Sequence, residues 1–228
     1  IKDKKRWFQR LGLFNPISIS MFLDLEEQIS KIEQIRPDVI DGYSSAIYLL
    51  ARDIKKVGAS IQPKIVFGSA EFLTEDMRKV INSTFGVQMF DQFGSVEMGR
   101  TAWECPEHAG YHIDVEATVM EFIQDGEKVS PGERGEIIYT NLYNYSMPLI
   151  RYKIEDVGIP SDEKCPCGRG LPLIKTLEGR KDSFVRTPDG RILPQMTFWS
   201  IVRMFPEQNR IPEFKVTQER LDRIQFEI

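Results

Sequence analysis

The feature that most constrains the fold is a strand, a helix and a second strand in close succession. Residues 64–67 are typical of a short buried strand, and Thr74 is a favourable N-cap for the helix that follows. That helix has an apolar face made of Met77, Val80, Ile81 and Phe85, and Gly86 ends it. Residues 87–90 form the second strand. A helical crossover of this length joins parallel strands, so the sequence predicts an α/β region with a parallel sheet.

Two further helices are predicted upstream of this unit. Leu25, Ile29 and Ile32 are spaced as on one helix face, and Pro37 stops that helix. Ser44 and Ser45 are suitable caps for a second helix, whose apolar residues are Ile47, Leu50 and Ile54 and which Gly58 ends. Ligands of parallel sheets bind beyond the carboxyl ends of the strands. Two segments, predicted to be loops, occupy that position here, residues 68–71 and 91–97.

The pattern changes after about residue 112. Residues 115–123 and 135–140 are predicted strands with turns at Asp125-Gly126 and Pro131-Gly132, which indicates a β-rich, antiparallel region. A hairpin with its turn at residues 188–190, a helix after Pro194 and strands near Phe214 and Ile224 are expected beyond a break at 179–182. We therefore predict three parts: an α/β subdomain at 1–112, a β-rich subdomain at 113–178 and the start of a small α+β domain at 179–228.

Composition excludes several classes of protein. The net charge of −4 disfavours nucleic acid as a general partner, and no apolar run is long enough to cross a membrane. Three cysteines are too few for a disulfide framework and indicate a reducing, cytoplasmic location. The basic start at Ile1 is not a secretory signal and lacks an initiator Met, and the last predicted strand reaches Ile228. We interpret the chain as an internal fragment of a longer protein.

The segment from Asp91 to Glu97 is the leading candidate for a ligand site. Gly94 allows a close backbone approach, Phe93 offers a flat face for stacking, and Glu97 is a suitable oxygen ligand for Mg²⁺. The residues alone leave an alternative open, in which this is a strand-to-helix turn with Phe93 in the core and Glu97 in solvent.

Several segments together resemble the adenylate-forming enzymes. Residues 91–99 resemble the Tyr-Gly-Ser/Thr-x-Glu signature of that superfamily, and Ser69-Ala70-Glu71 resembles its Gly/Ser-x-Glu segment. Residues 148–156 resemble its Pro-Leu-Ile-Arg-Tyr-x-x-Gly-Asp run, and residues 179–182 its Gly-Arg-x-Asp hinge. Residues 165–169 resemble a Cys-x-Cys-Gly-Arg element of the phenylacetate–CoA ligase-like branch, which includes capsule-biosynthesis adenylating proteins. These segments occur in the order of the family, from about Pro37 to at least Pro194.

The resemblance implies roles for individual residues. Phe93 stands where the family usually has Tyr against adenine, and Glu97 would be the catalytic residue that ligates Mg²⁺. Asp156 would accept hydrogen bonds from the ribose hydroxyls, and Arg180 and Asp182 would mark a hinge for a rotating C-terminal domain. The full set of implied nucleotide-binding residues is Ser69, Ala70, Glu71, Asp91, Gln92, Phe93, Gly94, Ser95, Asp156 and Arg180.

The chain also departs from the family pattern. Glu155 replaces the usual Gly beside Asp156 and adds a carboxylate near a polyphosphate site, which like-charge repulsion disfavours. The Ser/Thr/Gly-rich phosphate loop of the family and its catalytic Lys have no counterpart in these residues, because Lys215 lies in a predicted strand. We therefore expect the fragment alone to be inactive.

All cysteines and histidines fall in two short windows, residues 105–112 and 165–167. Three Cys and one His meet the count of a tetrahedral structural zinc site, with Cys105, Cys165 and Cys167 as ligands. Either His108 or His112 could complete it on spacing; the Gly-x-His arrangement at His112 recurs in the resembling branch and favours His112. The alternative is buried thiols and unrelated histidines.

Three functions follow as hypotheses. The first is part of an ATP-dependent acid–thiol ligase that converts a carboxylic acid to an acyl-adenylate and passes it to coenzyme A, with ATP/AMP, Mg²⁺ and Zn²⁺ as cofactors. The second is a non-catalytic, zinc-stabilised module with the same fold. The third is an adenylating enzyme of capsular polysaccharide biosynthesis, with an amine or hydroxyl as acceptor. The acid is not readable from the sequence, which neither requires nor excludes a homodimer.

Overall fold

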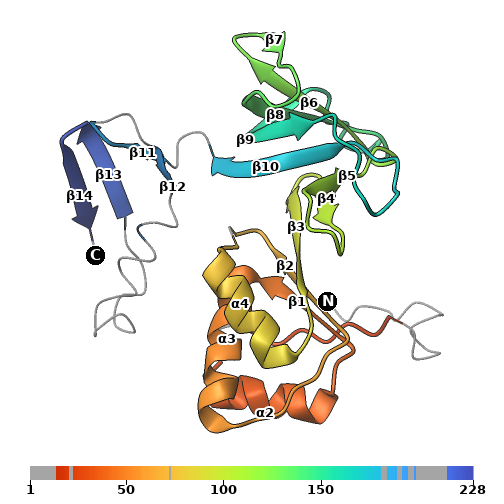
Figure 1. Ribbon diagram of the computed structural model, residues 1–228, viewed down its shortest axis with the longest axis vertical. Coiled ribbons are helices and arrows are strands. Elements are labelled where there is room, and N and C mark those ends of the chain that lie inside the picture. Colours follow the sequence, from red (N-terminus) through yellow and green to blue (C-terminus); the bar gives the residue numbers. More distant parts are fainter. Residues whose placement is uncertain are drawn as a thin grey trace.

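The structure is a computed structural model that describes residues 14–20, 23–71, 73–180, 184–188, 192–194, 198 and 215–227. Its centre is one ten-stranded sheet with the order β1-β2-β3-β4-β5-β10-β9-β8-β6-β7 (Figure 1). The helices are α2 (Leu25–Ile35), α3 (Ser44–Val57) and α4 (Glu75–Phe85). The strands of the sheet are β1 (Val39–Tyr43), β2 (Ile65–Ser69), β3 (Met89–Ser95), β4 (Gly99–Glu104), β5 (Tyr111–Ile113), β6 (Thr118–Gln124), β7 (Glu127–Lys128), β8 (Gly135–Asn141), β9 (Tyr152–Ser161) and β10 (Leu173–Arg180).

The first three strands are parallel, and the predicted crossover from β2 through α4 to β3 is confirmed. The three helices gather beside these strands in Figure 1. They bury one core with the sheet, in which Ile47 of α3, Ile81 of α4, Val66 of β2 and Met89 of β3 are at most 4% exposed. Burial of these aliphatic side chains, at about 25 cal/mol per Å² of apolar surface, holds the helices on the sheet.

The helix boundaries follow the sequence signals, with one exception. Thr74 caps α4 as predicted, because its Oγ1 accepts the N–H of Met77, and Gly58 and Gly86 end α3 and α4 in the left-handed conformation. The predicted serine cap of α3 is wrong. Tyr43 occupies the N-cap, and the Glu71 carboxylate accepts the N–H of Ser45 at 2.8 Å. The helix terminus is thus satisfied from a segment distant in sequence.

The prediction that residues 91–97 form a loop is wrong for residues 91–95. Residues 91–95 belong to β3, and a tight turn leads directly into β4, which pairs antiparallel with β3. No helix follows, so the strand-to-helix alternative is also wrong. The strands β1, β4, β5, β9 and β10 were not predicted, because each is short or interrupted by polar residues.

The second half is β-rich and antiparallel, as predicted, from β6 to β10. A second core lies there, with Ile137, Tyr139 and Ile174 fully buried. The same sheet continues from β5 to β10 and so crosses the predicted boundary at residue 112. The second core also crosses this boundary, because Met98 and Ala102 belong to it together with Ile137 and Ile174.

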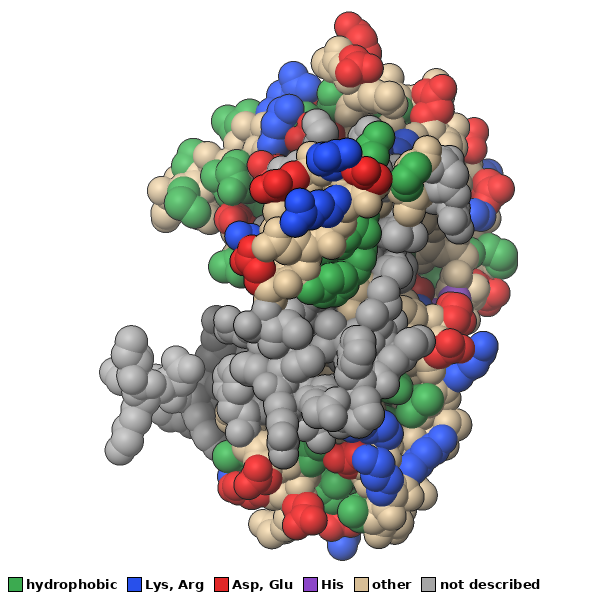
Figure 2. All heavy atoms as spheres, turned by 90° about the vertical axis from the view of Figure 1, so that its left-hand side faces the viewer, with side chains coloured by type: hydrophobic (Ala, Val, Ile, Leu, Met, Phe, Trp, Pro, Cys, Tyr) green, Lys and Arg blue, Asp and Glu red, His purple; other side chains and the backbone are tan. Residues whose placement is uncertain are grey.

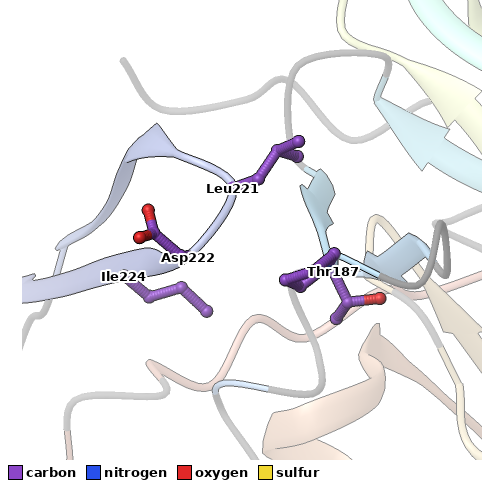
Figure 3. Close-up of a pocket in the computed structure, with 5 residues that line it drawn as sticks. Thr187, Leu221, Asp222 and Ile224 are labelled. Atoms are coloured by element: carbon purple, nitrogen blue, oxygen red, sulfur yellow. The ribbon is translucent and has the colours of Figure 1, made fainter.

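Two small hairpins follow the large sheet. The predicted hairpin with its turn at Pro188 is confirmed as β11 (Phe184–Arg186) with β12 (Ile192–Pro194). The last strands, β13 (Lys215–Arg220) and β14 (Arg223–Glu227), pair antiparallel with each other, so the terminal strand is paired. A shallow hollow between the two hairpins is lined by Thr187, Leu221 and Ile224 (Figure 3). The helix expected after Pro194 lies almost wholly outside the described residues.

The described surface carries both signs of charge. Figure 2 shows Lys and Arg side chains interspersed with Asp and Glu side chains on the face that it draws, in keeping with the net charge of −4. Among the described helices, none has the length and apolar character that a membrane span requires.

Candidate functional site

Two of the sequence motifs adjoin in the sheet. Ser69 is the last residue of β2 and pairs with Gln92 of β3, so the segment 69–71 lies beside the segment 91–97. Ala70 has a φ of 63°, a left-handed conformation that is strained for a residue with a Cβ atom. The turn at Ala70 directs Glu71 to the N-terminus of α3. Both motifs therefore lie where the parallel strands end, the usual place for a ligand in such sheets.

The residues of β3 have distinct local roles. A Cβ atom at Gly94 would overlap the carbonyl oxygen of Gly99, so this glycine is required by the tight β3–β4 hairpin. Ser95 stabilises the turn, because its Oγ accepts the N–H of Met98 at 3.2 Å. Gln92 is 6% exposed, and its Oε1 has no hydrogen-bond partner within the protein. Such an atom is expected to find a partner in water or a ligand.

Tyr139 lies near residues of both β3 and β9. The Tyr139 side chain is fully buried, and its hydroxyl lies 3.0 Å from Thr101 Oγ1. The ring of Phe93 lies 6.3 Å from that of Tyr139, centre to centre. Burial raises the pKa of Tyr139, and the charge of Asp156 raises it further. Phe93 from β3 and Asp156 from β9 therefore both lie in the neighbourhood of Tyr139.

Asp156 and Arg180 lie opposite each other in the ladder between β9 and β10. This pairing brings the ribose-binding candidate next to the hinge candidate. Asp182 lies outside the described residues. Glu155 has a φ of 66°, at the position where the resembling family has Gly, and its side chain is exposed. The extra carboxylate therefore points into solvent, which weakens the repulsion that its presence predicts.

Glu97 lies in the exposed turn between β3 and β4. The hydroxyl of Tyr152, at the start of β9, lies 3.4 Å from Glu97 Oε1. This contact places the carboxylate beside the first residue of β9, the strand that also carries Asp156. An exposed carboxylate is a suitable magnesium ligand, since Mg²⁺ is commonly bound by one or two protein carboxylates together with phosphates.

Asp91, two residues before Phe93 on β3, belongs to a buried hydrogen-bond network of its own. Its Oδ2 accepts the hydroxyl of Tyr111 at 2.7 Å, and its backbone N–H donates to Glu104 Oε2 at 2.8 Å. Arg78 of α4 makes two 2.9 Å bonds to the Glu104 carboxylate. Burial raises the pKa of Asp91 to about 6. Asp91 thus supports the strand from the helix side of the sheet.

The cysteines and one histidine form a compact cluster. The ligand atoms of Cys105, His112, Cys165 and Cys167 all lie within 4.8 Å of one another. The Sγ atoms of Cys105 and Cys165 are 3.5 Å apart, and Cys167 Sγ is 3.4 Å from His112 Nε2. A tetrahedral zinc site with bonds of about 2.0–2.3 Å separates its ligand atoms by roughly 3.5–3.8 Å. The donor set and its spacing therefore fit a structural zinc ion.

The protonation tendencies of Cys167 and His112 agree with metal binding, whereas the pKa of the Cys165 thiol is raised to about 11, because burial and the neighbouring thiols outweigh the backbone N–H of Cys167. The backbone N–H of Arg169 lowers the pKa of the Cys167 thiol to about 7, which favours the thiolate that binds metals. Burial and the charge of Arg169 lower the pKa of His112, which favours the neutral imidazole. Between the two histidines, the geometry supports His112. His108 stacks on Phe90 and lies 3.2 Å from the Glu104 carboxylate.

Sequence reasoning missed the residues that connect these groups. Tyr139, Tyr111 and Glu104 lie in strands, and none belongs to a recognisable motif. The available signal was an acidic residue directly after two apolar ones, Glu104 after Ala102 and Trp103. Buried acids require partners, and Arg78 was not identifiable as that partner from the sequence.

Several curated proteins are similar to this chain in sequence. The chain is 28% identical to protein CapK of Staphylococcus aureus over 233 residues, which covers 98% of this chain and 50% of CapK. It is 32% identical to phenylacetate–coenzyme A ligase of Escherichia coli over 78% of this chain and 42% of that protein, and 27% identical to the Thermus thermophilus enzyme. The chain thus spans about half the length of these relatives. No protein-family profile matches it.

Several solved structures of longer chains share the fold. A 2-hydroxyisobutyryl-CoA ligase matches 89% of this chain and 45% of its own, with a TM-score of 0.74 and 19% identity. The anthranilate–CoA ligase AuaEII, solved in complex with anthranoyl-AMP, matches 92% of this chain and 41% of its own, with a TM-score of 0.65 and 13% identity. The chain is therefore a relative of the phenylacetate–CoA ligases and CapK, with the fold of about half of an adenylate-forming enzyme.

Proposed function

We propose that this chain forms the adenine- and ribose-facing part of an AMP-forming acid–coenzyme A ligase. In such a reaction the substrate carboxylate attacks the α-phosphate of ATP, and pyrophosphate leaves. The thiol of coenzyme A then attacks the acyl carbon of the mixed anhydride, and AMP leaves. The two half-reactions together replace one difficult step, direct condensation of the acid with the thiol, by two easier ones, because AMP is a better leaving group than hydroxide.

The observation that carries the proposal is the convergence of separate motifs. Ser69 pairs with Gln92, the Phe93 ring lies 6.3 Å from that of Tyr139, and the charge of Asp156 raises the pKa of Tyr139; these contacts support the proposal, although about 90 residues of sequence separate Ser69 from Asp156. Asp156 would accept hydrogen bonds from the ribose diol, and Phe93 would pack against adenine. Gln92 would supply its unpaired Oε1 to the ligand, and Gly94 and Ser95 would line the α-phosphate.

Two metal ions have separate roles in this proposal. Glu97 would bind Mg²⁺ together with the phosphates, where the ion neutralises charge on the α-phosphate during attack. Zn²⁺ at Cys105, His112, Cys165 and Cys167 would be structural, because four protein ligands leave no open position for water or substrate. Arg180, next to Asp156, would mark the hinge on which a following domain turns.

Titration of the chain with AMP tests the nucleotide site. We expect measurable binding by calorimetry, and we expect Asp156→Asn to weaken it about tenfold or more, because a charge-assisted hydrogen bond contributes about 1.5–3 kcal/mol. Asp162→Asn is the matched control, since Asp162 is an exposed acid beyond the same strand. Equal affinity in the Asp156→Asn variant would contradict the ribose role, and no binding by the unaltered chain would contradict the proposal.

A second function is favoured by one specific observation. The match to CapK covers 98% of this chain, more than the matches to the phenylacetate–CoA ligases. An adenylating enzyme of capsular polysaccharide biosynthesis would share the first half-reaction and would transfer the acyl group to an amine or hydroxyl. Acceptor profiling of a full-length protein containing this chain distinguishes the two. Coenzyme A-dependent AMP release supports the ligase, and release that depends on a sugar amine or hydroxyl supports the alternative.

A further inference from the structure

The hairpin formed by β4 and β5 presents its two faces to two different clusters. Glu104 pairs with Tyr111 across the hairpin, and Trp103 pairs with His112. Directly opposed residues of antiparallel strands share a face, and neighbours along a strand alternate between faces. Glu104 and Tyr111 therefore face Asp91, whereas His112 and the adjoining Cys105 belong to the Cys/His cluster on the other face.

On the first face, the hairpin holds the nucleotide strand β3 by hydrogen bonds. Glu104 accepts the backbone N–H of Asp91, and Tyr111 donates to the Asp91 carboxylate. Arg78 fixes the Glu104 carboxylate from α4 and also donates to the carbonyl of Met89 at 2.6 Å. Asp91 and Glu104 are buried, and a buried network whose members are all paired is rigid. The register of β3 thus depends on where the hairpin places these two side chains.

The hairpin meets the β-rich half through the core that Ala102 and Ile113 share with Ile137 and Ile174, and on its second face through the Cys/His cluster. The ladder between β5 and β10 comprises two residue pairs, Leu173 with His112 and Ile174 with Tyr111. Cys165 and Cys167 lie in the connection from β9 to β10, so an ion bound by the cluster would fasten that connection to the hairpin. The row of opposed residues from Gln92 through Trp103 to His112 also runs directly from the nucleotide strand to a ligand.

We propose that the β4–β5 hairpin couples the metal cluster to the nucleotide strand, with Glu104 and Tyr111 as positioning residues. The ion fixes the hairpin on one face, and the hairpin then holds β3 in register on the other. The proposal rests on the metal site of the proposed function, and it assigns to that ion an effect on the strand that carries Gln92 and Phe93. Because coupling between sites is reciprocal, nucleotide bound at β3 in turn tightens the metal site.

Amide hydrogen exchange of the zinc-loaded chain, compared with the chelated chain, tests the coupling. We expect the amides of Asp91 and Gln92 to exchange on the order of tenfold faster after chelation, because the bonds that hold β3 become transient. The amides of β13, which lie in a separate sheet, should be unchanged. Unchanged exchange in β3 after complete removal of the ion would overturn the proposal and leave the proposed function intact.

A second variant covers the case in which chelation unfolds the whole chain. Tyr111→Phe with zinc retained removes the hydroxyl bond to Asp91 and should accelerate the β3 amides while α3 amides and zinc content stay as in the unaltered chain. Tyr145→Phe is the control, because this tyrosine is 88% exposed. Slow β3 exchange in Tyr111→Phe would overturn the positioning role. Absence of bound zinc in the unaltered chain would instead contradict the metal centre, and the coupling with it.

Discussion

Gly94 illustrates how one residue can satisfy two interpretations. From the sequence, its missing side chain allows a ligand to approach the backbone. In the structure, the carbonyl of Gly99 already occupies the space that a Cβ atom would need. The glycine is thus required for the hairpin that carries the motif, whether or not a ligand is bound.

Gly94→Ala should therefore destabilise the chain even without ligand. We expect a loss of about 2 kcal/mol in the free energy of unfolding, because the clash is with backbone that cannot rotate away. Urea denaturation measures this loss. Gly170→Ala is the control, since nothing lies within 4 Å of a Cβ there, and it should change stability by less than about 0.5 kcal/mol. Equal stability of the two variants would contradict the steric explanation.

Asp91 gives a prediction of pH dependence. Burial raises its pKa from the ordinary 3.8 to about 6. Between these values the folded chain retains a proton that the unfolded chain has lost, so stability falls as the pH rises through this window and levels off above it. Relative to Asp91→Asn, the unaltered chain should lose about 2–3 kcal/mol between about pH 4 and pH 7. Urea denaturation across this range measures the difference, and a flat difference curve would refute the assignment.

At the scale of elements, α4 is tied to the hairpin by a buried ion pair as well as by apolar packing. The side chains of Arg78 and Glu104 are 14% and 7% exposed, and their two hydrogen bonds join the helix to β4. A buried pair contributes little net stability, but removal of one partner leaves the other charge without compensation.

Arg78→Met should therefore cost about 3–5 kcal/mol in the free energy of unfolding, because Glu104 remains buried and charged. Adding Glu104→Gln should restore part of that loss, since a neutral side chain has no uncompensated charge. Thermal and urea denaturation of the single and double variants measure both effects. A double variant less stable than Arg78→Met would show that the two side chains do not act as a pair.

For the whole molecule, the Cys/His cluster joins segments that are far apart in sequence. Cys105 and Cys165 are 60 residues apart, and their side chains are buried together. A metal that binds the folded chain more tightly than the unfolded chain stabilises the fold by mass action. The cluster is therefore expected to contribute to global stability.

Removal of the metal should lower the melting temperature by several degrees, and re-addition of Zn²⁺ should restore it. Metal analysis should find about one zinc ion per chain after metal-replete expression. His112→Ala should reduce the zinc content, whereas His108→Ala, the matched control, should retain it, because His108 lies with Glu104 and Phe90. Zinc content near zero in the unaltered chain would remove the metal centre.

Many of the helices, strands and turns could be predicted from the sequence, because their signals lie within the elements themselves. The spacing of Met77, Ile81 and Phe85, the cap at Thr74 and the turn at Gly126 act within a few residues, so they predict the elements in which they lie. The motifs at 69–71, 91–97 and 156 indicated the superfamily for the same reason, because each carries its own chemistry.

The tertiary structure alone decided how these pieces meet. Glu71 caps α3, and Asp91 bonds to Tyr111 and Glu104; these contacts join residues 13 to 26 positions apart in sequence. The resemblance already favoured His112, and the structure supports it by placing His112 beside Cys167 and His108 beside Phe90 and Glu104. Side chains on opposite faces of a strand differ by one residue in sequence, and only the pairing of strands determines which cluster each face meets.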